Sequence, residues 1–151
     1  MATFFRIVQA QRAATAMDGE GGRLFGGRWN PPGMAAVYLA ESRALAALEI
    51  LVHAPREAML LEWCLIEVAV PDAWIEAVKP ARLPADWLAR PSSPGARQLG
   101  GKWLQLRSGV ALRLPSVIIP QEHILLINPL HPQAARLEVS APREFRLDLR
   151  F

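Results

Sequence analysis

One amphipathic helix between strand-like segments constrains the fold of this chain more than any other feature. The segment RALAALEILVH at 43–53 follows Ser42, whose short hydroxyl side chain is favoured at a helix N-cap. The apolar residues that recur at helical spacing and predict a core-facing stripe are Leu45, Leu48, Leu51 and Val52. Glu49 lies one turn after the first of these. We therefore expect its carboxylate to border the buried face.

Strand-like segments precede and follow this helix. TFFRIV at 3–8 and AAVYLA at 35–40 come before it, and MLLEWCLIEVAV at 59–70 is apolar enough on both alternating faces to predict a central strand covered on both sides. Later strand candidates are ALRL (111–114), SVIIP (116–120), ILLIN (124–128), RLEVSA (136–141) and EFRLDLRF (144–151), where Phe145, Leu147 and Leu149 alternate with charged residues. This order predicts an α/β (α+β) fold with a mixed sheet.

The length and composition fit one domain spanning residues 1–151. A chain of 151 residues with 52% hydrophobic and 21% charged residues is typical of globular proteins, and it can bury roughly two thirds of its unfolded surface. Residues 10–34 are glycine-rich and read as irregular, and 80–109 hold scattered proline and glycine with a possible helix over ARQLGGKWLQL at 96–106. We expect a single compact domain.

Cysteine and histidine usage argues against disulfides and metal sites. The one cysteine, Cys64, lies inside an apolar run, which excludes an intrachain disulfide and indicates a reducing compartment. His53, His123 and His131 show no paired ligand spacing, so we predict no metal. Arg6 and Gln9 interrupt the N-terminal apolar segment, and no stretch reaches the roughly 20 residues of a membrane span. We expect a cytoplasmic protein without membrane contact.

Several other chemistries lack their motifs. GxxxxGK[ST], GxGxxG with its strand and helix, HExxH and GxSxG are all absent. The net charge is +3, but the basic residues are dispersed along the chain and no helix-turn-helix or zinc finger is visible, so we predict no direct nucleic-acid binding. Most of the basic residues are arginine, which suits a phosphate or carboxylate ligand, although for any single arginine a solvated surface charge is the more ordinary interpretation.

One arginine has an unusual setting. In GGRWNPPG at 26–33, Arg28 stands between two glycines and a tryptophan, an arrangement that either makes an ordinary turn or lets a ligand approach the backbone. Combined with FRI at 5–7, AVYLAESRALAALEILVH at 36–53 and LPSVIIPQEHILLINPLHP at 114–132, this pattern resembles the RES-domain family. Members of that family are toxins of Xre-partnered toxin–antitoxin modules. The motifs extend over most of the chain outside 72–110.

The resemblance implies a fold similar to ADP-ribosyltransferases and an enzyme that destroys NAD at the nicotinamide–ribose bond. NAD is then the substrate, and no separate cofactor is expected. Carried over by motif, the expected catalytic residues are Arg28, Tyr38, Glu49 and Ser116. NAD binding would use Arg6, Arg28, Tyr38 and Ser116. Ile124 stands where family members often have an asparagine.

These residue types suit the chemistry. Nicotinamide is cationic in NAD and leaves as a neutral molecule, so cleavage needs no general acid, and one carboxylate such as Glu49 can stabilise the oxocarbenium-like charge on the ribose. The guanidinium of Arg28 fits the diphosphate, Tyr38 offers a flat face for nicotinamide, and Ser116 can bind an amide or a ribose hydroxyl. Each residue also has a structural alternative: loop carbonyls for Arg28, the core for Tyr38, an ion pair with His53 for Glu49, and a turn hydroxyl for Ser116.

Other functions remain open from sequence. The same site could transfer ADP-ribose to a protein, or the chain could be a non-catalytic module that binds a partner or nucleic acid. Resemblance also implies a cognate Xre-type helix-turn-helix antitoxin and a homodimer. The residues leave open whether water, phosphate or a protein receives the ADP-ribose.

Overall fold

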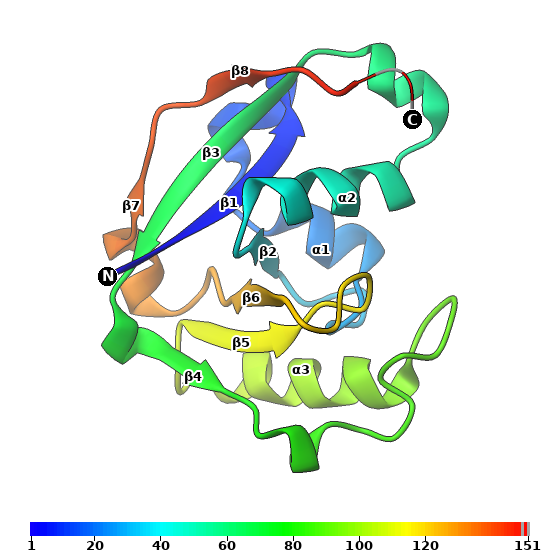
Figure 1. Ribbon diagram of the computed structural model, residues 1–151. Helices are drawn as coiled ribbons and strands as arrows, with labels where there is room; N and C mark the ends of the chain where they lie inside the picture. The colour runs from blue at the N-terminus through cyan, green and yellow to red at the C-terminus, as the bar shows by residue number, and fades with distance from the viewer. Residues whose placement is uncertain (149, 151) are drawn as a thin grey trace.

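The computed structural model describes residues 1–148 and 150, and these form a mixed α/β fold around one curled sheet (Figure 1). The strands are β1 Ala2–Gln9, β2 Val37–Ala40, β3 Trp63–Val70, β4 Ile75–Ala77, β5 Ala111–Pro115, β6 His123–Ile127, β7 Glu138–Val139 and β8 Arg143–Phe145. The α-helices are α1 Glu20–Phe25, α2 Arg43–His53 and α3 Pro94–Leu106. The 3-10 segments are Ala10–Thr15, Arg56–Leu60, Asp72–Trp74, Pro80–Arg82 and Pro132–Arg136.

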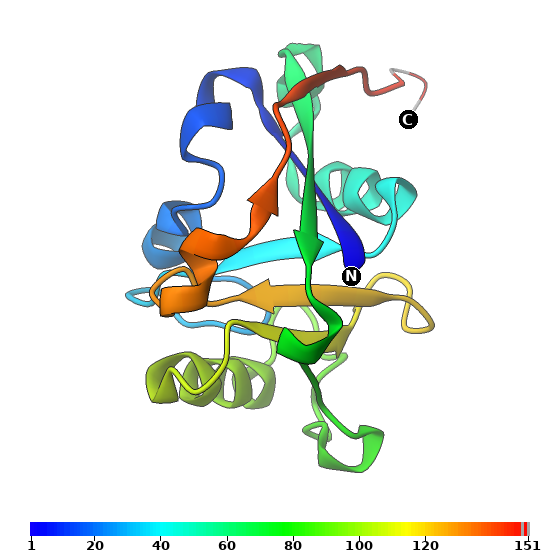
Figure 2. The same ribbon diagram turned by 90° about the vertical axis from the view of Figure 1, so that its left-hand side faces the viewer.

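The strand order is β4-β5-β6-β2-β1-β3-β7, and β8 also pairs with β3. β4 and β5 run parallel, whereas the other described pairings are antiparallel. The sheet is strongly twisted, so that β3 crosses the direction of β2 and β6 in Figure 2. The expected mixed α/β architecture with a mixed sheet is confirmed.

Side chains that alternate along the strands divide the core between the two faces of the sheet. Phe5 and Ile7 of β1 belong to a buried cluster that includes residues of α2 and α3. Phe4 and Val8 of the same strand belong to the opposite cluster, which the 3-10 segments flank. Tyr38 packs against the first cluster, on the face that α2 and α3 cover. This face carries the candidate site.

The helix α2 is confirmed, but its buried stripe is wrong by about one residue. Ser42 caps it by accepting a hydrogen bond from the Leu45 N–H at 3.0 Å. Leu45 and Ala46 are the buried residues of the helix, whereas Val52 is 56% exposed. Because α2 packs against β1 and β2 through this face, Glu49 is half-buried at its border, as the sequence predicts.

Other local expectations are corrected. SVIIP at 116–120 is a turn between β5 and β6, because the Ser116 side chain accepts hydrogen bonds from the N–H groups two and three residues later. β3 begins at Trp63 instead of Met59, but it pairs with β1 on one side and with the short β7 and β8 on the other, so it is an interior strand as predicted. β8 ends at Phe145, and Leu149 of the predicted terminal strand lies outside the described residues.

The region that reads as irregular, 10–34, contains the 3-10 segment Ala10–Thr15 and the short helix α1. The predicted helix over 96–106 is confirmed and begins two residues earlier, at Pro94, after the capping residue Ser93. None of the helices among the described residues is long and apolar enough to span a bilayer.

Candidate active site

A cavity of about 540 Å³ lies against the sheet face that α2 and α3 cover, and we name it the Arg28 cavity. It brings together side chains from β1, β2, α2, the loop before β2 and the turn after β5. All five residues predicted from the sequence line it: Arg6, Arg28, Tyr38, Glu49 and Ser116. A second cavity of about 570 Å³, between residues 59–64 and 144–147, contains none of them. The chemistry therefore points to the Arg28 cavity although the other has a similar volume.

Glu49 extends from α2 into the cavity and keeps about a third of its side chain exposed. Its Oε1 lies 3.5 Å from the Ser116 hydroxyl, which donates a long hydrogen bond, and its Oε2 lies 3.8 Å from Nε2 of His53. Burial raises the pKa of Glu49, and the Ser116 hydrogen bond and the charge of Arg28 partly oppose this shift. The site thus holds a half-buried carboxylate whose charged form is disfavoured by burial.

Ser116 lies in the turn directly after β5 and is buried. Its Oγ accepts hydrogen bonds from the N–H groups of Ile118 at 3.0 Å and Ile119 at 3.1 Å. The same oxygen donates toward Glu49, so its hydrogen atom is directed at the carboxylate. The turn-hydroxyl alternative is therefore confirmed, and the turn holds Ser116 so that its hydroxyl is directed at Glu49.

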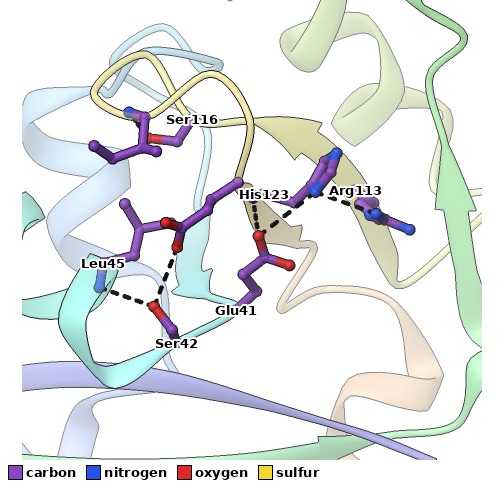
Figure 3. A network of polar contacts seen from close by, with 8 residues as sticks. Glu41, Ser42, Leu45, Arg113, Ser116 and His123 are labelled. Carbon is purple, nitrogen blue, oxygen red and sulfur yellow. Dashed lines mark hydrogen bonds and ion pairs between the residues drawn. The ribbon is translucent and has the colours of Figure 1, made fainter.

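A polar network holds this turn against the start of α2 (Figure 3). Ser42 donates a hydrogen bond to Oε1 of Glu122 at 3.3 Å, and the Ser116 N–H donates to the Glu122 carbonyl at 2.9 Å. Beside it, Oε1 of Glu41 accepts the His123 N–H at 2.7 Å. Because these contacts join the N-terminus of α2 to both ends of the β5–β6 turn, they set the separation of Glu49 and Ser116.

Tyr38 contributes one wall of the cavity from β2, but its hydroxyl is engaged in the loop before the strand. It donates to Oδ1 of Asn30 at 2.6 Å and accepts the Trp29 N–H at 3.0 Å. Burial raises the pKa of Tyr38 well above its ordinary value, so the phenol stays protonated. A side chain at Gly27 would meet the Tyr38 ring and hydroxyl at 2.7–2.8 Å. The loop thus packs directly on the tyrosine.

Asn30 and Trp29 fix the same loop. The Asn30 Nδ2 donates to the carbonyls of Gly22, Pro31 and Met34 at 3.0–3.1 Å. Trp29 is 1% exposed and stacks with Trp87 at a ring separation of 6.3 Å. The residue between this anchored pair and the glycines is Arg28, whose backbone position is therefore well defined.

Arg28 combines a structural role with a place on the cavity wall. Its Nη1 donates to the carbonyls of Ala89 at 2.5 Å and Trp87 at 3.3 Å. These are the bonds to loop carbonyls that the structural alternative for Arg28 predicts. Burial and the nearby Arg90 and Arg97 lower its pKa, but an arginine stays charged at neutral pH. Among residues 1–148 and 150, no carboxylate lies within ion-pair distance of Arg28.

Arg6 reaches the cavity from β1. Its Nε donates to the Ala16 carbonyl at 3.0 Å and its Nη1 to the Tyr38 carbonyl at 3.1 Å. Burial lowers its pKa, partly opposed by the charge of Asp18. Ile124 of β6 also lines the cavity, so an apolar side chain occupies the position where the family often has an amide.

Sequence reasoning missed Arg97, which reaches the cavity from α3. It lies in the segment 72–110, where the sequence contains no motif that indicates a functional residue. The packing of α3 alone brings it to the site. Within the described part of the chain, no cluster of three His, Cys, Asp or Glu side chains could hold a metal ion.

The geometry can be compared with known proteins. A model of the RES domain matches residues 3–149. The chain belongs to the RES-domain family. It is similar to the Prs ADP-ribosylating toxin of Sphingobium sp. (strain YBL2), with 40% identity over 98% of this chain and 95% of that one. A shorter similarity, 47% identity over 49 residues, links it to the NAD(+) phosphorylase MbcT of Mycobacterium tuberculosis (strain ATCC 25618 / H37Rv), covering 32% of this chain and 25% of that one.

A solved structure also has a fold similar to that of this chain. The match is to the M. tuberculosis MbcT-MbcA toxin–antitoxin complex, with a TM-score of 0.78 and 22% identity over 96% of this chain and 84% of that one. At this identity the likeness shows the fold alone.

Proposed function

We propose that this RES-domain chain is a toxin enzyme that depletes NAD by cleaving its nicotinamide–ribose bond. The observation that carries the proposal is the half-buried Glu49 carboxylate, oriented by Ser116, on the wall of a cavity that also contains Arg28. The related proteins named as an ADP-ribosylating toxin and an NAD(+) phosphorylase support the same substrate and bond.

The chemistry needs one carboxylate and little else. Because nicotinamide leaves as a neutral molecule, the transition state gathers positive charge on the ribose while no proton has to reach the leaving group. A carboxylate whose burial disfavours its ionised form is stabilised when that charge develops beside it. Glu49 would therefore bind the transition state more tightly than the substrate.

Binding would involve the other residues of the cavity. The ring of Tyr38 would pack against nicotinamide, since its hydroxyl is already engaged by Trp29 and Asn30. Arg28 would contact the diphosphate through the nitrogens not bound to the loop carbonyls. Arg6 would act mainly through charge and through its hold on the Tyr38 carbonyl.

The acceptor of the ADP-ribose divides the proposal into two forms. In the first form a small molecule is the acceptor: phosphate makes the enzyme a phosphorylase, and water makes it a glycohydrolase. The similarity to an NAD(+) phosphorylase supports phosphate. Protein ADP-ribosylation is the second candidate function, because the relative that matches 98% of this chain is named for ADP-ribosylation.

We further propose that an antitoxin inhibits the enzyme by covering the Arg28 cavity. The solved complex with a similar fold contains a toxin and its antitoxin, which supports a partner of this kind. An Xre-type antitoxin, a homodimer and a cytoplasmic location remain predictions. Size-exclusion chromatography of the chain alone and with its co-expressed antitoxin tests the assembly.

The decisive experiment incubates purified protein with NAD, with and without inorganic phosphate, and separates the products by chromatography. We expect free nicotinamide, together with ADP-ribose or its 1-phosphorylated form, and the second product names the acceptor. A parallel incubation with isotopically labelled NAD and cell lysate, read by mass spectrometry, detects modified proteins. An unchanged NAD peak and no labelled protein from folded, antitoxin-free material would refute the enzyme.

A further inference from the structure

We propose that Arg97 and Arg28 together form a two-armed clamp for the diphosphate of NAD; this inference rests on the proposed function. Arg97 extends from the first turns of α3, and Arg28 from the loop before β2, so two segments far apart in sequence supply the two arms. Both side chains are half-buried and line the Arg28 cavity.

The position of Arg97 is fixed relative to Arg28. Its Nε donates to the carbonyl of Gly27, the residue directly before Arg28, at 3.4 Å. Nε is the one donor of this guanidinium that takes part in a hydrogen bond within the described chain, so Nη1 and Nη2 are available to a ligand. Arg28 likewise uses only Nη1 for the carbonyls of Trp87 and Ala89. Each arm is therefore anchored at one nitrogen and open at others.

The charges of the cavity are unbalanced. The described residues that line it include Arg6, Arg28 and Arg97, and Glu49 is the one carboxylate among them. The nearby Asp86 accepts the Gly95 N–H at 3.1 Å and so is directed at the start of α3. Two guanidinium groups held close together without an ion-pair partner repel each other, and a ligand with two negative charges relieves that repulsion.

The cavity contains both kinds of charge that NAD requires. Arg28 and Arg97 line it together with Glu49, and the charges of Glu49 and Arg97 both act on Arg28. Glu49 would face the ribose that carries nicotinamide, and the diphosphate follows that ribose directly. Arg28 and Arg97 would then receive the two phosphate groups, and each guanidinium can bind phosphate oxygens bidentately.

The test measures the binding of ADP-ribose, which carries the diphosphate without nicotinamide, by isothermal titration calorimetry. Arg97→Ala should weaken ADP-ribose binding by about tenfold or more, because at least one charge-assisted hydrogen bond is lost. Arg97→Lys keeps the charge and the helix but loses the bidentate geometry, so an intermediate loss is expected. Lys102→Ala removes an exposed cation from the same helix outside the cavity and should leave binding unchanged.

Nicotinamide release by the same proteins separates this inference from the proposed function. ADP-ribose binding that depends on Arg97, in a wild-type protein that releases no nicotinamide, supports the clamp and refutes the enzyme. Nicotinamide release with wild-type ADP-ribose affinity in both Arg97 variants overturns the clamp and leaves the enzyme standing. A rise confined to the KM for inorganic phosphate also overturns the clamp, because Arg97 would then bind the acceptor. A wild-type protein with neither property refutes both.

Discussion

Replacing Tyr38 with phenylalanine removes one oxygen atom and keeps the aromatic ring on the wall of the Arg28 cavity. That oxygen makes two hydrogen bonds, to Oδ1 of Asn30 at 2.6 Å and from the Trp29 N–H at 3.0 Å. Both partners are buried residues, at 0% and 1% exposure, so each is left without this partner in the variant. An unsatisfied buried group costs about 1–3 kcal/mol, so the two groups together give a loss of about 2–6 kcal/mol in the free energy of unfolding.

Thermal and chemical unfolding measure this loss directly. For a domain of this size each kcal/mol lowers the Tm by about 2–4 °C, so we expect Tyr38→Phe to melt about 4–24 °C below the wild type. Assayed below that transition, the variant should keep its kcat for NAD cleavage within about tenfold, because the ring remains. Its KM should rise, since the Trp29 N–H helps to hold the loop that carries Arg28.

Asn128→Ala provides the matched control for this prediction. Asn128 is buried and also makes two hydrogen bonds, from Nδ2 to the Leu104 carbonyl at 3.0 Å and from the Leu130 N–H to Oδ1 at 3.1 Å. It does not line the cavity, so this variant should lose comparable stability and keep both kcat and KM. A Tyr38→Phe protein with wild-type stability and a kcat reduced a thousandfold would refute the reasoning, because the hydroxyl would then act on the substrate.

Four further predictions follow from the site and its packing. Glu49→Gln should lower the rate of nicotinamide release about 10³-fold, because two charges some 4 Å apart at a protein surface attract each other by about 4 kcal/mol. The control Glu57→Gln should not change this rate. Full activity or toxicity in the folded Glu49→Gln protein contradicts the assignment. Because the pKa of Glu49 is raised, its contribution to stability is lost as the pH rises through that pKa, so Glu49→Gln should melt no lower than wild type at neutral pH. For the same reason the acidic limb of the kcat profile should lie above the pKa of an ordinary glutamate, and a limb at or below that value contradicts the burial argument. Gly100→Ala should lower the free energy of unfolding by about 3 kcal/mol or more, because the added Cβ would lie 1.8 Å from the Trp29 carbonyl oxygen. In the control Gly21→Ala the added Cβ meets nothing within 4 Å. Equal melting temperatures for the two variants would exclude this contact.

The helix α2 and its cap follow from the sequence because their signals are local. Ser42 and the apolar spacing after it predict the helix, and the structure confirms both. Which face is buried is not a local property, since it depends on how α2 lies across β1 and β2. Leu45 and Ala46 are therefore buried and Val52 is exposed, although an equally regular stripe includes Val52.

SVIIP shows how a strand composition can be overridden. Its β-branched residues favour a strand, but the Ser116 side chain binds the N–H groups of Ile118 and Ile119 and closes a turn. Residues 116–120 could form a strand or a turn, and the turn forms because β5 and β6 pair with each other on either side of it. Their pairing extends from Ala111 opposite Ile127 to Pro115 opposite His123.

By itself the sequence determined the fold class, the family pattern, and the types of residue that the candidate site uses, because these are carried by composition, periodicity and short motifs. Only the tertiary structure decided that the Tyr38 hydroxyl belongs to the loop, that Ser116 is directed at Glu49, and that Arg97 shares the cavity with Arg28. The reason is physical. These contacts join segments separated by tens of residues, and they exist only once the sheet has curled and α2 and α3 have packed on its face.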